Sequence, residues 1–267
     1  MSRLSEKFAS LRQAGKKGLI PFITAGDPNP EASLPLLHAM VEAGADVIEL
    51  GVPFSDPMAD GPVIQKASER ALRHKMSLRK VLDLVEAFRA TDPVTPIVLM
   101  GYLNPVEAMG YRAFVDRAKA VGVDGVLTVD MPPEESSELL EMLDQAGIAP
   151  IFLLAPNSSP ERIGQMGKLG RGYLYYVSLK GVTGASHLNL DDVKQKLAEI
   201  RQYTDLPIGV GFGVKNAETA AAVSRLADAV VVGSALVAQV EAHGDDTAAS
   251  RNAIAATLKS MRLTMDA

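Results

Sequence analysis

Eight short apolar runs recur along the chain and alternate with longer segments that have a helical pattern. Each run is about five to seven residues long, continuous rather than alternating in polarity, and rich in Val, Ile and Leu, which is typical of parallel strands buried on both faces. The runs are GLIPFIT, ADVIEL, PIVLM, DGVLTV, APIFLLA, GYLYYV, PIGVGF and DAVVVG. Helices are expected between them at 31–43, 77–90, 106–121, 133–146, 191–203 and 216–226.

This order of elements predicts an α/β fold, a single (β/α)8 TIM barrel. The chain has 267 residues and no linker, simple repeat or low-complexity segment divides it, so one barrel domain spanning 1–267 is expected. An extra N-terminal helix with Leu4, Phe8 and Leu11 on one face is expected to close the bottom of the barrel. A short extra helix is expected after strand 8. An open doubly wound sheet is the alternative that the same pattern allows.

Composition argues against several classes of partner and site. The net charge is −5 and there is no basic run, so neither nucleic acid nor an anionic membrane is expected as a partner. The absence of cysteine excludes disulfides and thiolate chemistry and fits a cytoplasmic location. The N-terminus lacks the apolar core of a signal peptide, and no stretch approaches the roughly 20 apolar residues of a membrane span. The four histidines lie far apart, so no metal site is expected.

Within the apolar stretch 47–53, which includes the end of the second run, the one ionised side chain is Glu49. A carboxylate at the C-terminal end of a barrel strand lies in the barrel mouth, where partial burial raises its pKa towards the range useful for proton transfer. A structural ion pair is the alternative. The long loop that follows, 51–61, adds Asp56, a natural turn residue, and Asp60, which is also placed to cap the next helix.

Glycine-bearing turns follow the late strands, at 181–184, 211–213 and 233–234. Glycine lets backbone N–H groups approach an anion closely, and the loops after strands 7 and 8 commonly bind phosphate in barrels, together with the start of a short helix. We therefore predict a phosphate site there, with Ser234 at the N-terminus of the short helix. Ordinary tight turns are the alternative.

The stretches PFITAGDP and DVIELGVPFSDPMADGP, followed by PIVLMGYLNPV, VDGVLTVDMPPEES, PIFLLAPNSSPERI, GYLYYVSLKGVTGA, PIGVGFGV and ADAVVVGSALV, resemble the alpha subunit of tryptophan synthase over essentially the whole chain. The resemblance implies a lyase that splits indole-3-glycerol phosphate into indole and glyceraldehyde 3-phosphate by a retro-aldol reaction, without a cofactor. Glu49 matches the family's catalytic glutamate, which protonates indole C3 and deprotonates the glycerol hydroxyl. Asp60 matches the catalytic aspartate, which stabilises the cationic ring.

The resemblance also implies a substrate pocket. Phe22 and Tyr175 match substrate-pocket positions near the ends of strands 1 and 6, although without the resemblance a core position is favoured for each. Thr183 matches a loop threonine that bonds the catalytic aspartate when the loop closes; without the resemblance it is a turn residue. The positions that match the family's phosphate site are Gly184, Gly213, Gly233 and Ser234.

A partner follows from the same resemblance, namely a beta subunit that carries pyridoxal phosphate and receives the indole in an alpha2beta2 complex. This chain itself is expected to bind no cofactor. Segments 53–60, 104–105 and 130–133 match the partner-facing regions of the family. At Leu179-Lys180 the chain lacks an arginine that some relatives have, so no cation is assigned to the phosphate, and a Schiff base on Lys180 is a weaker mechanistic alternative.

Two other functions compete with the lyase. Another phosphosugar barrel enzyme, such as indole-glycerol-phosphate synthase or a phosphoribosyl isomerase, shares the phosphate turns but not the combination of Glu49 and Asp60. A non-catalytic subunit that only binds and regulates a second enzyme is the other alternative. Both catalytic carboxylates and Thr183 are present, which argues against it.

Overall fold

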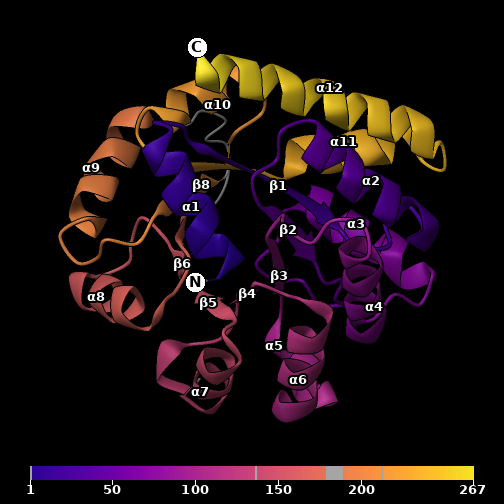
Figure 1. Ribbon diagram of the computed structural model, residues 1–267, viewed down its shortest axis with the longest axis horizontal. Helices are drawn as coiled ribbons and strands as arrows, with labels where there is room; N and C mark the ends of the chain where they lie inside the picture. Colours follow the sequence, from indigo (N-terminus) through magenta and orange to yellow (C-terminus); the bar gives the residue numbers. More distant parts are fainter. Residues whose placement is uncertain (1, 136, 179–188, 212) are drawn as a thin grey trace.

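The computed structural model describes residues 2–135, 137–178, 189–211 and 213–267. Its parallel strands form a ring that the helices surround (Figure 1). The strands are β1 Gly18–Thr24, β2 Ile48–Gly51, β3 Ile97–Gly101, β4 Gly125–Thr128, β5 Ala149–Ile151, β6 Leu153–Leu154, β7 Leu174–Val177, β8 Ile208–Gly211 and β9 Ala229–Val232. The helices are α1 Arg3–Gln13, α2 Pro30–Glu42, α3 Pro62–Arg73, α4 Leu78–Arg89, α5 Leu103–Met109, α6 Tyr111–Val121, α7 Ser137–Ala146, α8 Pro160–Leu169, α9 Leu190–Ile200, α10 Ala217–Ser224, α11 Ser234–His243 and α12 Thr247–Asp266, with a 3-10 turn η1 at Pro133–Glu135.

The predicted barrel is confirmed, with its fifth strand divided into β5 and β6. The sheet order β5-β4-β3-β2-β1-β9-β8-β7-β6 puts these two consecutive segments at opposite ends of the ladder. Only Phe152 separates them, and its carbonyl accepts the N–H of Tyr175 at 3.0 Å. One continuous stretch therefore pairs first with β4 and then with β7, so the two edges of the sheet meet. The open doubly wound alternative is wrong.

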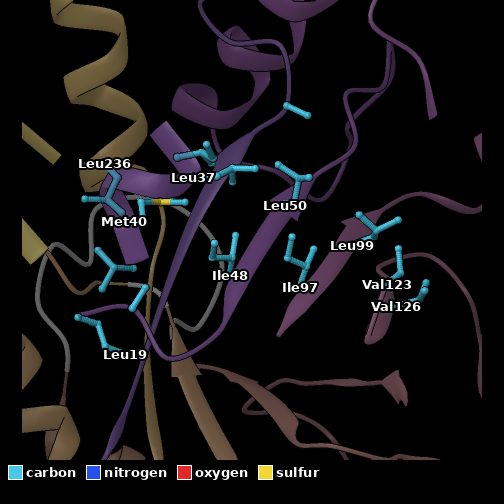
Figure 2. Close-up of a cluster of buried hydrophobic side chains, with 14 of the residues drawn as sticks. Leu19, Leu37, Met40, Ile48, Leu50, Ile97, Leu99, Val123, Val126 and Leu236 are labelled. Atoms are coloured by element: carbon cyan, nitrogen blue, oxygen red, sulfur yellow. The ribbon is translucent and has the colours of Figure 1, made fainter. Parts of the chain in front are cut away.

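Strand residues alternate between the barrel interior and an outer layer against the helices. In β2, Ile48 and Leu50 belong to the outer apolar core, whereas Glu49 and the preceding Val47 point inward. Figure 2 shows part of the outer layer, where the strand residues Ile48 and Leu50 belong to the same cluster as Met40 of α2. The alternation fixes which residues can reach the centre of the barrel, and Glu49 is one of them.

The N-terminal helix closes the barrel at the N-terminal ends of the strands, as predicted. Its residues Leu4, Phe8 and Leu11 are buried in the interior cluster, and the ring centroids of Phe8 and Tyr173 lie 5.7 Å apart. A Cβ on Gly125, the first residue of β4, would lie 3.2 Å from Leu4, which places the helix against the N-terminal ends of the strands. In Figure 1, α1 crosses the centre of the ring.

Three helix predictions need correction. Of the helix expected at 133–146, the α-helical part is α7, Ser137–Ala146, and Pro133–Glu135 forms the 3-10 turn η1. The helix expected at 106–121 is two helices, α5 and α6, because Gly110 between them has φ +86°, a left-handed value that ends the first helix. The helix expected at 191–203 ends at Ile200. The short helix after the last strand is confirmed as α11 and is followed by the longer α12. In the described part of the chain, no helix combines the length and the apolar character needed to cross a bilayer.

Candidate active site

Glu49 is the second residue of β2, lies inside the barrel and has 0 % of its surface exposed. The hydroxyl of Tyr173, which points inward from the start of β7, donates a hydrogen bond to Oε1 of Glu49. The other carboxylate oxygen, Oε2, has no hydrogen-bond partner among the described residues. The hydrogen bond to Oε1 therefore fixes the orientation of the carboxyl group, and Oε2 makes no hydrogen bond to the described residues.

Burial raises the pKa of Glu49 from 4.5 to about 8, although the hydrogen bond from Tyr173 lowers it. The ionised form is disfavoured because burial removes it from water and, among the described residues, no cationic side chain is paired with it. Burial and the neighbouring Glu49 also keep the pKa values of Tyr173 and Tyr175 well above the ordinary tyrosine value, so both hydroxyls stay protonated. Glu49 therefore carries its proton near neutral pH and can exchange it there, as an acid–base group requires.

Asp60 lies in the loop between β2 and α3, and the structure shows that it does not cap the helix. The N-cap residue of α3 is Gly61, which makes no side-chain cap hydrogen bond. Oδ2 of Asp60 instead accepts the hydroxyl of Tyr102 at 3.0 Å, and the oxygen of that hydroxyl accepts the N–H of Ala59 at 3.0 Å. Burial raises the pKa of Asp60 above its ordinary value, and the hydrogen bond from Tyr102 lowers it. Asp56 is exposed and bonded to Ser55, as a turn residue would be.

Two aromatic rings line the interior next to Glu49. Phe22 on β1 pairs in register with Glu49, and Tyr175 lies on the inner face of β7; both are buried. A Cβ on Gly51 would lie 2.6 Å from Cζ of Phe22, and one on Gly211 would collide with the hydroxyl of Tyr175. The two glycines at the ends of β2 and β8 therefore leave room for the rings.

The candidate phosphate turns lie at the same end of the barrel. Gly213, shortly after β8, has φ +81°, and Gly233 is the N-cap of α11 without a side-chain cap hydrogen bond. Ser234 is the first residue of α11, as predicted. A Cβ on Gly233 would lie 3.6 Å from the ring of Phe22, so the start of α11 adjoins the aromatic part of the site. Thr183 and Gly184 lie outside the described residues.

Sequence reasoning missed two tyrosines that hold the carboxylates. Tyr173 precedes Tyr175 by two positions, and the two-residue period of a strand places both on the inner face. Tyr102 directly follows β3, at the same rim as Asp60, and its ring stacks on Phe54 with centroids 5.2 Å apart. Within the described residues, no cluster of His, Asp or Glu side chains has the arrangement of a metal site.

Comparison with known proteins identifies the family to which the chain belongs. The sequence model described as "Tryptophan synthase alpha chain" matches residues 8–265. The chain belongs to this family. It is 70% identical to the tryptophan synthase alpha chain of Methylococcus capsulatus over the full length of both chains, and 60% identical to that of Thioalkalivibrio sulfidiphilus, again over both complete chains.

Solved structures of the family have the same fold. The tryptophan synthase subunit alpha of Legionella pneumophila superposes with a TM-score of 0.92 at 44% identity, covering 100% of this chain and 99% of that one. A chain from the tryptophan synthase of Mycobacterium tuberculosis, in an aminoacrylate-bound form, gives a TM-score of 0.88 at 33% identity, covering 99% of this chain and 100% of that one. The sequence-based resemblance is thereby confirmed.

Proposed function

We propose that Glu49 and Asp60 carry out the family's lyase reaction in this chain, the cleavage of indole-3-glycerol phosphate in tryptophan biosynthesis. As a member of the family, the chain is a carbon–carbon lyase. The burial of Glu49, which brings its pKa to about 8, is the observation that supports the assignment of its role. A carboxyl group that is protonated near neutral pH can serve first as an acid and then as a base.

The reaction is balanced by two proton transfers at Glu49, one given and one taken. The protonated carboxyl gives its proton to indole C3, and the resulting carboxylate then takes the proton of the glycerol hydroxyl attached to the carbon of the breaking bond. The electron pair of the O–H bond forms the aldehyde C=O, and the pair of the C–C bond returns to the indole ring. The products are indole and glyceraldehyde 3-phosphate, and Glu49 ends protonated.

Asp60 has a different task in this proposal. When C3 is protonated, the indole ring becomes cationic, and a fixed carboxylate near the ring N–H stabilises that charge. The hydroxyl of Tyr102 holds Oδ2 of Asp60, which favours a single rotamer and the ionised form. Phe22 and Tyr175 supply apolar surface for the ring.

The phosphate end of the substrate is assigned to the turns at Gly213 and Gly233 and to the first turn of α11 at Ser234. Support comes from the position of these turns after the last two barrel strands and from the uncapped start of α11. Gly184 and Thr183 complete the proposed set by the family resemblance alone. The whole chain, 1–267, is proposed to act as one domain.

The family implies a beta-subunit partner, which we propose binds in an alpha2beta2 complex in the cytoplasm and alone carries pyridoxal phosphate. The three candidate partner-facing segments lie near one another in the structure. The N–H of Leu103 donates to Asp130 at 2.8 Å, which ties segment 104–105 to segment 130–133, and Phe54 stacks on Tyr102. Met58 in segment 53–60 is 85% exposed, as expected of an apolar side chain that a partner covers.

The test is to incubate the purified chain with indole-3-glycerol phosphate under single-turnover conditions and measure indole. Glu49→Gln and Asp60→Asn should each lower the cleavage rate by at least about two orders of magnitude, while affinity for glycerol phosphate changes little. Asp56→Asn, which removes an exposed carboxylate from the same loop, is the matched control and should cleave normally. Near-normal cleavage by Glu49→Gln would refute the role of Glu49.

A further inference from the structure

The backbone of Asp60 is held by the helix that follows it. Asp60 lies two positions before the first residue of α3, and Nε2 of Gln65 on this helix donates to the carbonyl of Asp60 at 2.9 Å. The same amide lies 3.5 Å from the carbonyl of Pro57. A rotation or shift of α3 therefore moves the main chain of Asp60 with it.

α3 packs against the barrel through small buried side chains and two larger, partly buried ones. Its buried residues are Ala67, Ser68 and Ala71. Ala67 packs with Phe22 of β1 and Val237 of α11, and Val63 and Ile64 near the start of α3 pack against the same cluster. Apolar packing is non-directional, so the rotation of α3 about its axis is left to be fixed by polar contacts.

Arg70 supplies the directional contacts that the small side chains lack. Its Nε and Nη2 donate to the two carboxylate oxygens of Asp27 at 2.6 and 3.0 Å, in the fork geometry that only arginine provides. Asp27 follows β1 and is 2% exposed. Nη1 of Arg70 lies 3.2 Å from Oε1 of Glu241 on α11. Arg70 thus joins α3 to the end of β1 and to the helix whose first residue is Ser234.

We propose that Arg70 is a positioning residue for catalysis, which orients α3 so that Asp60 is correctly placed relative to the phosphate end of the substrate at α11. The inference rests on the functions proposed above for Asp60 and for the start of α11. Arg70 acts through Gln65 and the main chain, and it does not contact the substrate itself.

The test compares Arg70→Lys with a matched pair at the other end of the barrel. Lysine keeps the charge but loses the two parallel hydrogen bonds to Asp27, so the kcat for indole formation should fall at least about tenfold, because misplacement by about 1 Å is costly in catalysis. Affinity for glycerol phosphate should stay within about twofold, since α11 itself is intact. Arg89→Lys breaks a similarly buried pair with Asp124, 2.6 Å apart, near the N-terminal ends of the strands. It should lower the melting temperature and leave kcat unchanged.

A second variant tests the connection from α3 to Asp60 and leaves the ion pair of Arg70 with Asp27 intact. Gln65→Met removes the hydrogen bond to the Asp60 carbonyl, so it should lower kcat as Arg70→Lys does, and the two effects should not add. If Arg70→Lys fails to fold, Gln65→Met still tests the route from α3 to Asp60. Unchanged kcat in either folded variant, or equal losses in Arg70→Lys and Arg89→Lys, would overturn the inference.

Combining Arg70→Lys with Asp60→Asn separates this inference from the proposed function. If Arg70 acts by placing Asp60, Arg70→Lys should cause little further loss of kcat in the Asp60→Asn background. A full additional loss would show that Arg70 acts by another route and would overturn the inference alone. Normal cleavage by Asp60→Asn itself would instead overturn the proposed role of Asp60.

Discussion

Replacing Glu49 by Gln should make the protein more stable relative to the wild type as the pH rises from about 5 to about 8. The pKa of Glu49 is raised from 4.5 to about 8 in the folded protein, chiefly by burial. Below the unfolded value, the carboxyl is protonated in both states and contributes nothing to the pH dependence. Above it, the unfolded chain releases a proton that the folded chain keeps, so the free energy of unfolding falls until the folded carboxyl also ionises.

The size of the effect follows from this window. Each pH unit between the two pKa values removes about 1.4 kcal/mol from wild-type stability, which amounts to about 3 kcal/mol by pH 7. Glutamine has the same shape and stays neutral at every pH, so it escapes this loss. Its amide N–H2 takes the place of Oε2, which has no partner among the described residues, and an unsatisfied donor costs about 1–3 kcal/mol. That cost does not depend on pH. The prediction therefore concerns how the difference in unfolding free energy between the two proteins changes with pH, and not its value at any one pH.

The measurement is urea unfolding of both proteins at about pH 5, 6, 7 and 8. The difference between Glu49→Gln and wild type should grow steadily in favour of the variant. Parallel stability curves for Glu49→Gln and wild type would show that Glu49 is ionised in the folded protein. The reaction could not then begin with proton donation from this residue.

Three further outcomes follow from other contacts. Tyr173→Phe removes a hydrogen bond that lowers the pKa of Glu49, so the alkaline limb of the kcat/KM profile should move to higher pH; an unmoved limb would assign that limb to another group. Gly213→Asp should weaken glycerol-phosphate binding sharply with an unchanged circular dichroism spectrum. Gly213→Ala has the same backbone strain at φ +81° but no charge, so it should retain more affinity. Equal affinities of the two variants would place the phosphate elsewhere. Asp46→Ala removes the acceptor of the Leu19 N–H, 2.9 Å away, and should lower the free energy of unfolding by about 1–3 kcal/mol without changing kcat.

The barrel could be predicted from the sequence because each strand is buried on both faces and therefore reads as a continuous apolar run. The split between β5 and β6 could not, since APIFLLA is uniformly apolar and only the curvature of the closed sheet makes its two halves pair with different neighbours. The break between α5 and α6 had a local signal in Gly110. Glycine is tolerated inside some helices, and the left-handed φ that ends α5 becomes visible only in the structure.

Glu49 could be found from the sequence because it is the single charge in an apolar strand, and Asp60 because the family motif surrounds it. Their partners could not be assigned in this way. Tyr173 and Tyr102 are separated from the carboxylates by 124 and 42 positions, and a tyrosine beside an apolar run fits a core as well as a site. Which hydroxyl meets which carboxylate depends on how the strands and loops are arranged around the barrel.

The two carboxylates differ in the way their proposed tasks require. In the proposed reaction Glu49 changes charge twice in each turnover, so its two protonation states must be close in free energy near the working pH, and complete burial brings its pKa to about 8. Asp60 is proposed to remain an anion while the ring becomes cationic. Burial raises its pKa as well, but Asp60 is only partly buried and a hydroxyl donor favours its ionised form. An arginine beside Glu49 would lower its pKa and remove the proton that begins the reaction, whereas hydroxyl donors orient both carboxylates without adding a full positive charge. The choice of tyrosine for both contacts therefore follows from the chemistry as much as from packing.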